Sequence, residues 1–129
     1  MQASKSPVPG DDQMSGEESC RQVLQILSLI GSKWSILVIG QLHDRTMRFS
    51  ELHRAVHGIS QRMLTLTLRG LERDGLVGRT VHPSVPPRVD YALTDLGATL
   101  LGSMTALSDW ASVHRVEINE HRARYDAEG

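Results

Sequence analysis

Polar residues that can recognise bases recur along one segment of the sequence. Gln61, Arg62, Thr65 and Arg69 lie about one helical turn apart, directly after Ser60. Arginine can donate two hydrogen bonds to guanine, glutamine can pair with adenine, and the threonine methyl group can contact a thymine methyl. Ser60 is placed to cap the helix at the end where free backbone N–H groups attract phosphate. The segment therefore predicts a helix that reads base pairs in duplex DNA, and an ordinary solvated helix face is the alternative.

The elements around this segment follow from the spacing of apolar residues. Its buried stripe consists of Leu64, Leu68 and Leu71. This pattern predicts a helix from Ser60 to about Asp74 that ends at Gly75, and a shorter helix precedes it over residues 49–56. Gly58 separates the two. Two short helices joined by a glycine-containing turn are typical of a helix-turn-helix.

A hairpin is predicted after the second helix, because the apolar period changes from helical to alternating. Residues 76–81 and 89–93 are expected to form its strands, and three prolines stiffen the tip between them. Arg79, Ser84 and Arg88 lie on this hairpin, where arginine can enter a narrow minor groove. A plain surface hairpin is the alternative. With the two helices, this order predicts a mainly α protein with a small two-stranded antiparallel wing, which is a winged helix-turn-helix.

Further apolar helices flank this module. They are predicted over about residues 17–30, after Ser32, and from residue 95 onward. The last helix keeps Leu101 and Trp110 off its main apolar stripe, so a second apolar face requires a partner to cover it. The last helix is therefore expected to pack against a partner, as in a dimer.

The composition fits one domain between two tails. Residues 1–16 are rich in Pro, Gly, Ser and Asp and predict a disordered tail, residues 17–124 form the domain, and residues 125–129 form a second tail. The 129-residue chain has a net charge of −1, yet residues 43–88 hold eight arginines and four acidic residues, a difference of four positive charges. This excess is typical of a phosphate-binding surface, whereas the 4% aromatic content disfavours stacking on single strands.

Enzyme, metal and membrane functions find little support in the sequence. It has no glycine-rich phosphate loop and no Gly-x-Ser-x-Gly segment, and its lone cysteine, Cys20, lies near the predicted tail, where a base is poorly placed to activate it. His53 and His57 have a helical metal-ligand spacing but no third ligand beside them. No apolar run approaches the roughly 20 residues that span a bilayer. We therefore expect a cytoplasmic protein without catalysis, metal, cofactor or membrane partner.

Several blocks of the sequence resemble the HxlR family of winged helix-turn-helix regulators, a branch close to the MarR-like proteins. They are residues 30–34, 48–52, 58–65, 71–77 and 85–97, within a span of roughly 20–110. The last block, which joins a Pro-Pro-Arg wing to a Thr-Asp-Leu-Gly helix start, is the most specific. The resemblance implies a homodimer, with the first and last helices at its interface, that controls transcription of an adjacent gene. It also implies a pseudo-palindromic operator with half-sites on the order of 34–36 Å apart.

The resemblance also indicates which residues contact DNA. The expected contacts are Arg48, Ser50, Ser60, Gln61, Arg62, Thr65, Arg69, Arg79, Ser84 and Arg88. Arg62 and Arg69 are expected to enter the major groove, and Arg88 to act from the wing. A winged-helix module that binds a protein instead of DNA is the alternative, and arginines at these positions argue against it.

An effector is implied as well. Many family members carry a cysteine at the start of the first helix that senses electrophiles or oxidants, because a helix N-terminus stabilises the reactive thiolate. Here the family position falls on Arg21, and Cys20 lies one residue before it. Related regulators bind apolar molecules at the dimer interface, and Trp34, Met104 and Trp110 are the candidates for such a pocket. A redox or ligand sensor with DNA binding as its output is thus a further hypothesis.

Overall fold

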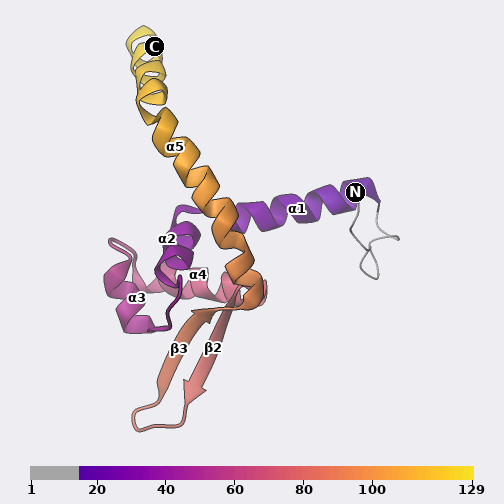
Figure 1. The fold of residues 1–129 in the computed structure, drawn as a ribbon, viewed down its shortest axis with the longest axis vertical. Helices are drawn as coiled ribbons and strands as arrows, with labels where there is room; N and C mark the ends of the chain where they lie inside the picture. The colour runs from indigo at the N-terminus through magenta and orange to yellow at the C-terminus, as the bar shows by residue number, and fades with distance from the viewer. Residues whose placement is uncertain (1–14) are drawn as a thin grey trace.

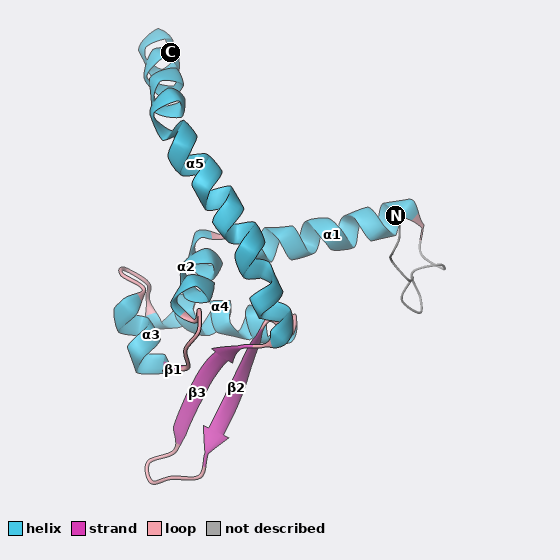
Figure 2. Ribbon diagram, in the orientation of Figure 1, coloured by secondary structure: helices cyan, strands magenta, loops and turns pink. Residues whose placement is uncertain are grey.

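The computed structural model describes residues 15–129, so residues 1–14 of the tail predicted at residues 1–16 lie outside the described residues. In chain order the elements are α1 (Gly16–Ile30), α2 (Lys33–Gln41), β1 (Met47–Arg48), α3 (Phe49–Ala55), α4 (Gln61–Arg73), β2 (Val77–His82), β3 (Arg88–Leu93) and α5 (Asp95–Glu128). α2, α3 and α4 pack together, the β2–β3 hairpin extends from them, and α1 and α5 project outward (Figure 1). The mainly helical fold with a small antiparallel sheet confirms the predicted class (Figure 2).

The sheet has three strands in the order β1-β3-β2, where two strands were predicted. The additional strand, β1, pairs residues 47–48 with residues 90–91 of β3. Two residues are too few to show an alternating pattern, and their pairing with β3 is distant in sequence, so the sequence does not reveal this strand. The wing itself is the predicted hairpin, in which residues 77–82 pair with residues 88–93.

Alternation along the strands gives the sheet two different faces. One face carries Met47, Val77, Tyr91 and Leu93, which pack on the helical core. The other face carries Arg48, Thr80, His82, Arg88 and Asp90. Arg79 belongs to the first set, so the two wing arginines, Arg79 and Arg88, extend from opposite faces of the hairpin.

All the described helices except α3 begin at a serine or threonine cap. Ser32, Ser60 and Thr94 each accept a hydrogen bond from a backbone N–H in the first turn of the helix that follows, as predicted. The first helix begins earlier than expected, because Ser15 and Glu18 form a capping box at its start. The predicted tail is therefore too long by the two residues that start this helix.

The C-terminal helix continues to Glu128, so the tail predicted at residues 125–129 is wrong. Between Gly102 and Gly129 the chain contains no glycine or proline, and it is rich in Glu, Arg and Ala, which favour helix. At about 1.5 Å per residue, the 34 residues of α5 extend roughly 50 Å. This rod leaves the domain on the side away from the wing tip (Figure 1).

The core lies between α2, α3, α4 and the start of the wing. Its fully buried side chains include Val38, Ile39, Leu52, Leu64 and Leu71. α2 is apolar along most of its length, yet its Ile36 and Leu37 are 39% and 41% exposed in the single protomer. Among residues 15–129, no single helix is long and apolar enough to span a membrane, and α1 with α2 qualifies only as a pair bent by 67°.

Candidate nucleic-acid interface

The exposed face of α4 carries the predicted base-reading side chains. Its core side consists of Leu64, Thr67, Leu68 and Leu71. On the other side, Gln61, Arg62, Thr65 and Arg69 line one surface groove together with Phe49 and Leu66. Ser60 caps the helix, with its Oγ 3.0 Å from the N–H of Met63. The structure thus brings four of the predicted residues together on one helix face, and it assigns the Ser60 hydroxyl a capping role.

Phe49 is a central residue of this surface that the sequence analysis did not include. It lines the groove along α4, a second groove that reaches the wing tip, and a third at the base of the wing. Its ring stacks on that of His53, with the centroids 6.4 Å apart. Phe49 is the only phenylalanine in a chain poor in aromatic residues, and it follows Arg48 at a helix start. Its status as the only phenylalanine was the one feature of the sequence that could have indicated this position.

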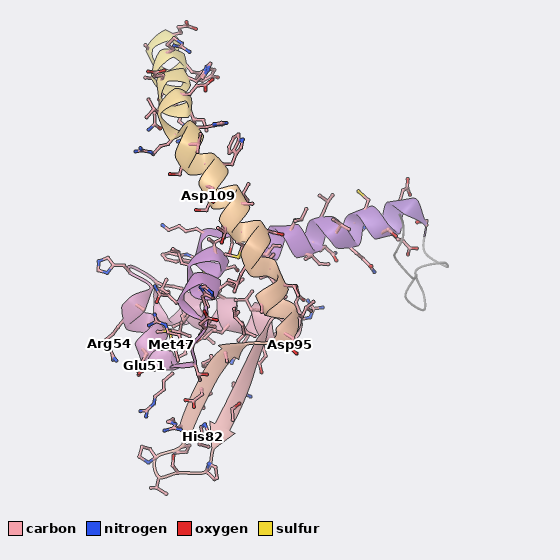
Figure 3. The ribbon with its side chains drawn as sticks, viewed as in Figure 1. Met47, Glu51, Arg54, His82, Asp95 and Asp109 are labelled. Carbon is pink, nitrogen blue, oxygen red and sulfur yellow. The ribbon has the colours of Figure 1, made fainter. Side chains whose placement is uncertain are left out.

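The start of α3 and the wing tip face each other across the second groove. Its walls are formed by Arg48, Phe49 and Ser50 on one side and by residues 84–89 on the other. Arg48 and Ser50 are both exposed, and the backbone N–H of Arg48 donates to Glu51 at 2.8 Å, which fixes the first turn of α3. Figure 3 shows this part of α3, with Glu51 and Arg54 labelled, beside the root of the wing. Arg48 and Ser50 are therefore continuous with the wing rather than isolated from it.

Arg79 occupies the base of the wing, on the side that faces α4. Its Nε lies 3.4 Å from Oε2 of Glu72, and both side chains are about half exposed. The same small pocket is lined by Thr65, Arg69 and Tyr91. Burial raises the pKa of the Tyr91 hydroxyl above its usual value, with Arg79 opposing and Glu72 reinforcing the effect. Arg79 thus joins the wing to α4, in addition to any role at DNA.

At the wing tip, Ser84 and Arg88 make contacts within the hairpin. The Ser84 hydroxyl donates to the Pro86 carbonyl at 2.7 Å, so it shapes the tip. The Nε of Arg88 lies 3.5 Å from Oδ1 of Asp90, and its side chain is 43% exposed. Arg88 therefore keeps donors available to a ligand, while the Ser84 hydroxyl is already engaged.

The predicted effector residues do not converge in a single protomer. Cys20 is free and exposed, in the second turn of α1. Trp34 and Met104 pack partly buried against the core, whereas Trp110 is exposed and contacts the ring of His114. A different apolar cavity lies between α1, α5 and the start of the wing, and its lining includes Ile26, Ile30, Leu76, Leu96 and Leu100. Within residues 15–129, no three His, Cys, Asp or Glu side chains are grouped so that they could hold a metal ion.

A helix-turn-helix with a basic helix face, followed by a basic hairpin, defines a winged-helix DNA-binding protein. Residues 29–119 match the model of the HxlR-like helix-turn-helix family, and the chain belongs to this family. It is a DNA-binding transcriptional regulator, as predicted from the sequence.

Relatives and solved structures agree with this assignment. An uncharacterized HTH-type transcriptional regulator from Methanothermobacter thermautotrophicus is 45% identical over 105 residues, which cover 81% of this chain and 79% of the relative. The regulator YtfH of Escherichia coli K12 is 38% identical over 94 residues, covering 73% and 75%. Among solved structures, the redox regulator HypR in its reduced form has a TM-score of 0.70 at 39% identity, covering 77% of this chain and 98% of that one. Diamide-treated YodB from B. subtilis has a TM-score of 0.62 at 33% identity, covering 77% and 93%.

Proposed function

We propose that the protein binds a specific duplex operator, with α4 in the major groove and the wing on the adjacent backbone or minor groove. The observation that carries this proposal is the exposed α4 face of Gln61, Arg62, Thr65 and Arg69, opposite a buried side made mostly of leucines. A helix of this width fits a major groove about 12 Å wide. The groove from α3 to the wing adds Arg48 and Arg88 at the two ends of the surface. The proposed activity is binding without catalysis.

We propose that the binding form is a homodimer joined through α1 and α5. α1 has no buried residue in one protomer, and its Val23, Leu24, Ile26 and Leu27 are about half exposed. Only Gly97 is buried among the 34 residues of α5, although Leu107, Trp110 and Val113 lie along it. Apolar surface on this scale is unusual for a monomer, and a second copy covers it most simply. Two-fold symmetry then requires a pseudo-palindromic operator.

Selection of bound duplexes from genomic fragments tests the proposal. The wild-type protein should recover one palindromic class of site. Arg62→Ala should reduce discrimination at one base position by about 1–3 kcal/mol, because a bidentate contact to guanine is lost. Arg122→Ala, on the exposed C-terminal part of α5, removes the same charge and should leave the selected site unchanged. Recovery of unrelated fragments alone would refute specific binding and favour the alternative, a module that binds a protein.

A redox signal is a second proposal, supported by the exposure of Cys20. The similar solved structures include one described as a redox regulator and one treated with diamide. We propose that oxidation of the Cys20 thiol changes operator affinity. Cys20→Ser should bind the operator equally with and without oxidant, as measured by fluorescence anisotropy. An oxidant response that persists in this variant would exclude Cys20. The apolar-ligand site at Trp34, Met104 and Trp110 and the cytoplasmic location stay predictions.

A further inference from the structure

One acidic side chain is embedded in the basic surface of the wing. Asp90 lies on β3, and its side chain is only 18% exposed. Its Oδ2 is 2.8 Å from Nε2 of His82, and its Oδ1 is 3.5 Å from Nε of Arg88. Because a carboxylate only accepts, the His82 ring donates the hydrogen bond between them, and the Arg88 guanidinium forms an ion pair with the same carboxylate. One carboxylate thus holds two basic side chains, one from each strand of the wing.

The register of the sheet explains why this carboxylate is well placed. β3 is the central strand, and Asp90 pairs with Arg48 of β1 on one side and with Thr80 of β2 on the other. Alternation places Arg48, His82 and Arg88 on the same face as Asp90. His82 lies towards the far end of the wing in Figure 3. Asp90 therefore lies on the central strand, where its carboxylate can hold the ends of longer basic side chains on the same face.

A carboxylate at a DNA-binding surface has two opposing effects. Its negative charge weakens attraction to phosphates, which is the main source of affinity for non-target DNA. Its contacts also restrict the orientations of Arg88, and a long side chain held in one orientation loses less conformational freedom when it binds. The first effect lowers affinity for every sequence, whereas the second favours only a site whose shape fits the held arginine. The second effect therefore increases the ratio of specific to non-specific affinity, while the first lowers the affinity for non-target DNA.

We propose that Asp90 is a positioning residue that determines specificity, because it orients Arg88 and His82 and limits binding to non-target DNA. This inference rests on the proposed operator binding. Under this inference, the wing limits binding to non-target DNA in addition to attracting the DNA backbone. The role belongs to an acidic residue, so a search for basic side chains alone overlooks it.

Asp90→Asn tests the inference, since it keeps the size of the side chain and removes its charge. Binding to the selected operator and to a scrambled duplex would be measured by anisotropy over a range of salt concentrations. We expect affinity for the scrambled duplex to rise about threefold, its salt dependence to steepen by up to about one in the log–log slope, and the ratio of specific to non-specific affinity to fall about fivefold. Asp126→Asn, on the exposed last turn of α5 and remote from the wing (Figure 1), makes the same charge change and should alter neither affinity. An unchanged ratio in Asp90→Asn would overturn the proposal.

A measurement without DNA separates this inference from the proposed function. The Nε–H resonance of Arg88 should be resolved in wild-type NMR spectra and broadened by exchange in Asp90→Asn, with the thermal midpoint of each protein as the control for folding. If the wild-type protein selects no site, operator binding fails, and the Arg88 resonance still decides whether Asp90 positions this side chain. An Arg88 resonance that is identical in both proteins would refute the positioning role.

Discussion

The junction between α5 and the wing depends on a glycine that no other residue can replace without movement. A Cβ placed on Gly97 would lie 2.0 Å from the carbonyl oxygen of Leu76 and 3.0 Å from its carbonyl carbon. Both atoms belong to the backbone, so no side chain can rotate away. The same carbonyl accepts from the Thr94 N–H at 3.1 Å, which ties the start of α5 to the start of the wing. Gly97→Ala should therefore force this junction apart by about 1 Å or more, since real Cβ atoms essentially never lie within 3.0 Å of another non-bonded heavy atom.

The expected cost can be compared within the same helix. Overpacking typically costs about 1–3 kcal/mol, and a backbone clash of this depth with loss of the Thr94 hydrogen bond places Gly97→Ala at about 3 kcal/mol. Gly102→Ala meets no atom within 4 Å in the protomer and should instead stabilise the helix by about 0.5–1 kcal/mol. Urea unfolding followed by circular dichroism measures the free energy of unfolding of both variants. Measurements at two protein concentrations separate the contribution of dimerisation. Equal stability of the two variants would refute the described contact between α5 and Leu76.

Three other outcomes follow from the same structure. Leu24→Glu, on the exposed face of α1, should produce a folded monomer in sedimentation and weaken operator binding; a persistent dimer would place the interface elsewhere. Glu72→Gln should change the free energy of unfolding by less than about 1 kcal/mol, because its pair with Arg79 is half exposed, yet raise affinity for DNA of any sequence; unchanged affinity would place Arg79 outside the interface. The raised pKa of Tyr91 means that the folded state holds the hydroxyl proton more tightly than the unfolded state does. The stability that comes from this difference is complete below about pH 10 and is lost as pH rises through the folded pKa. Tyr91→Phe should remove that loss from thermal midpoints measured across this range, and an identical pH profile would contradict it.

Local patterns in the sequence were sufficient to predict the helix-turn-helix. The stripe of Leu64, Leu68 and Leu71, the cap at Ser60 and the stop at Gly75 are all encoded within one segment, and Gly75 adopts the predicted C-terminal role at a φ of 79°. Features that depend on residues distant in sequence were not predicted. β1 exists only because β3 pairs with it, and Phe49 becomes central only when α3, α4 and the wing meet.

The same distinction applies to the wing arginines. Their presence on a hairpin was readable from the sequence, but their placement on opposite faces follows only from the observed register of β2 and β3. Their acidic partners were not readable. Glu72 reaches Arg79 from another element, and Asp90 becomes a shared partner only in the observed register of β2 and β3.

The distribution of ion pairs indicates different roles for α4 and the wing in DNA binding. In the part of the chain that the structure describes, Arg79 and Arg88 each lie beside a carboxylate, whereas no such pair involves Arg62 or Arg69. A guanidinium without an acidic neighbour attracts phosphate of any sequence, and a paired one binds only where DNA can displace or share its partner. In the proposed binding mode, α4 would therefore supply attraction together with base contacts, and the wing would supply a contact that depends on the local shape of the DNA. A regulator that must find one site among many benefits from this division, because reducing non-specific affinity improves the search as much as strengthening the specific contacts.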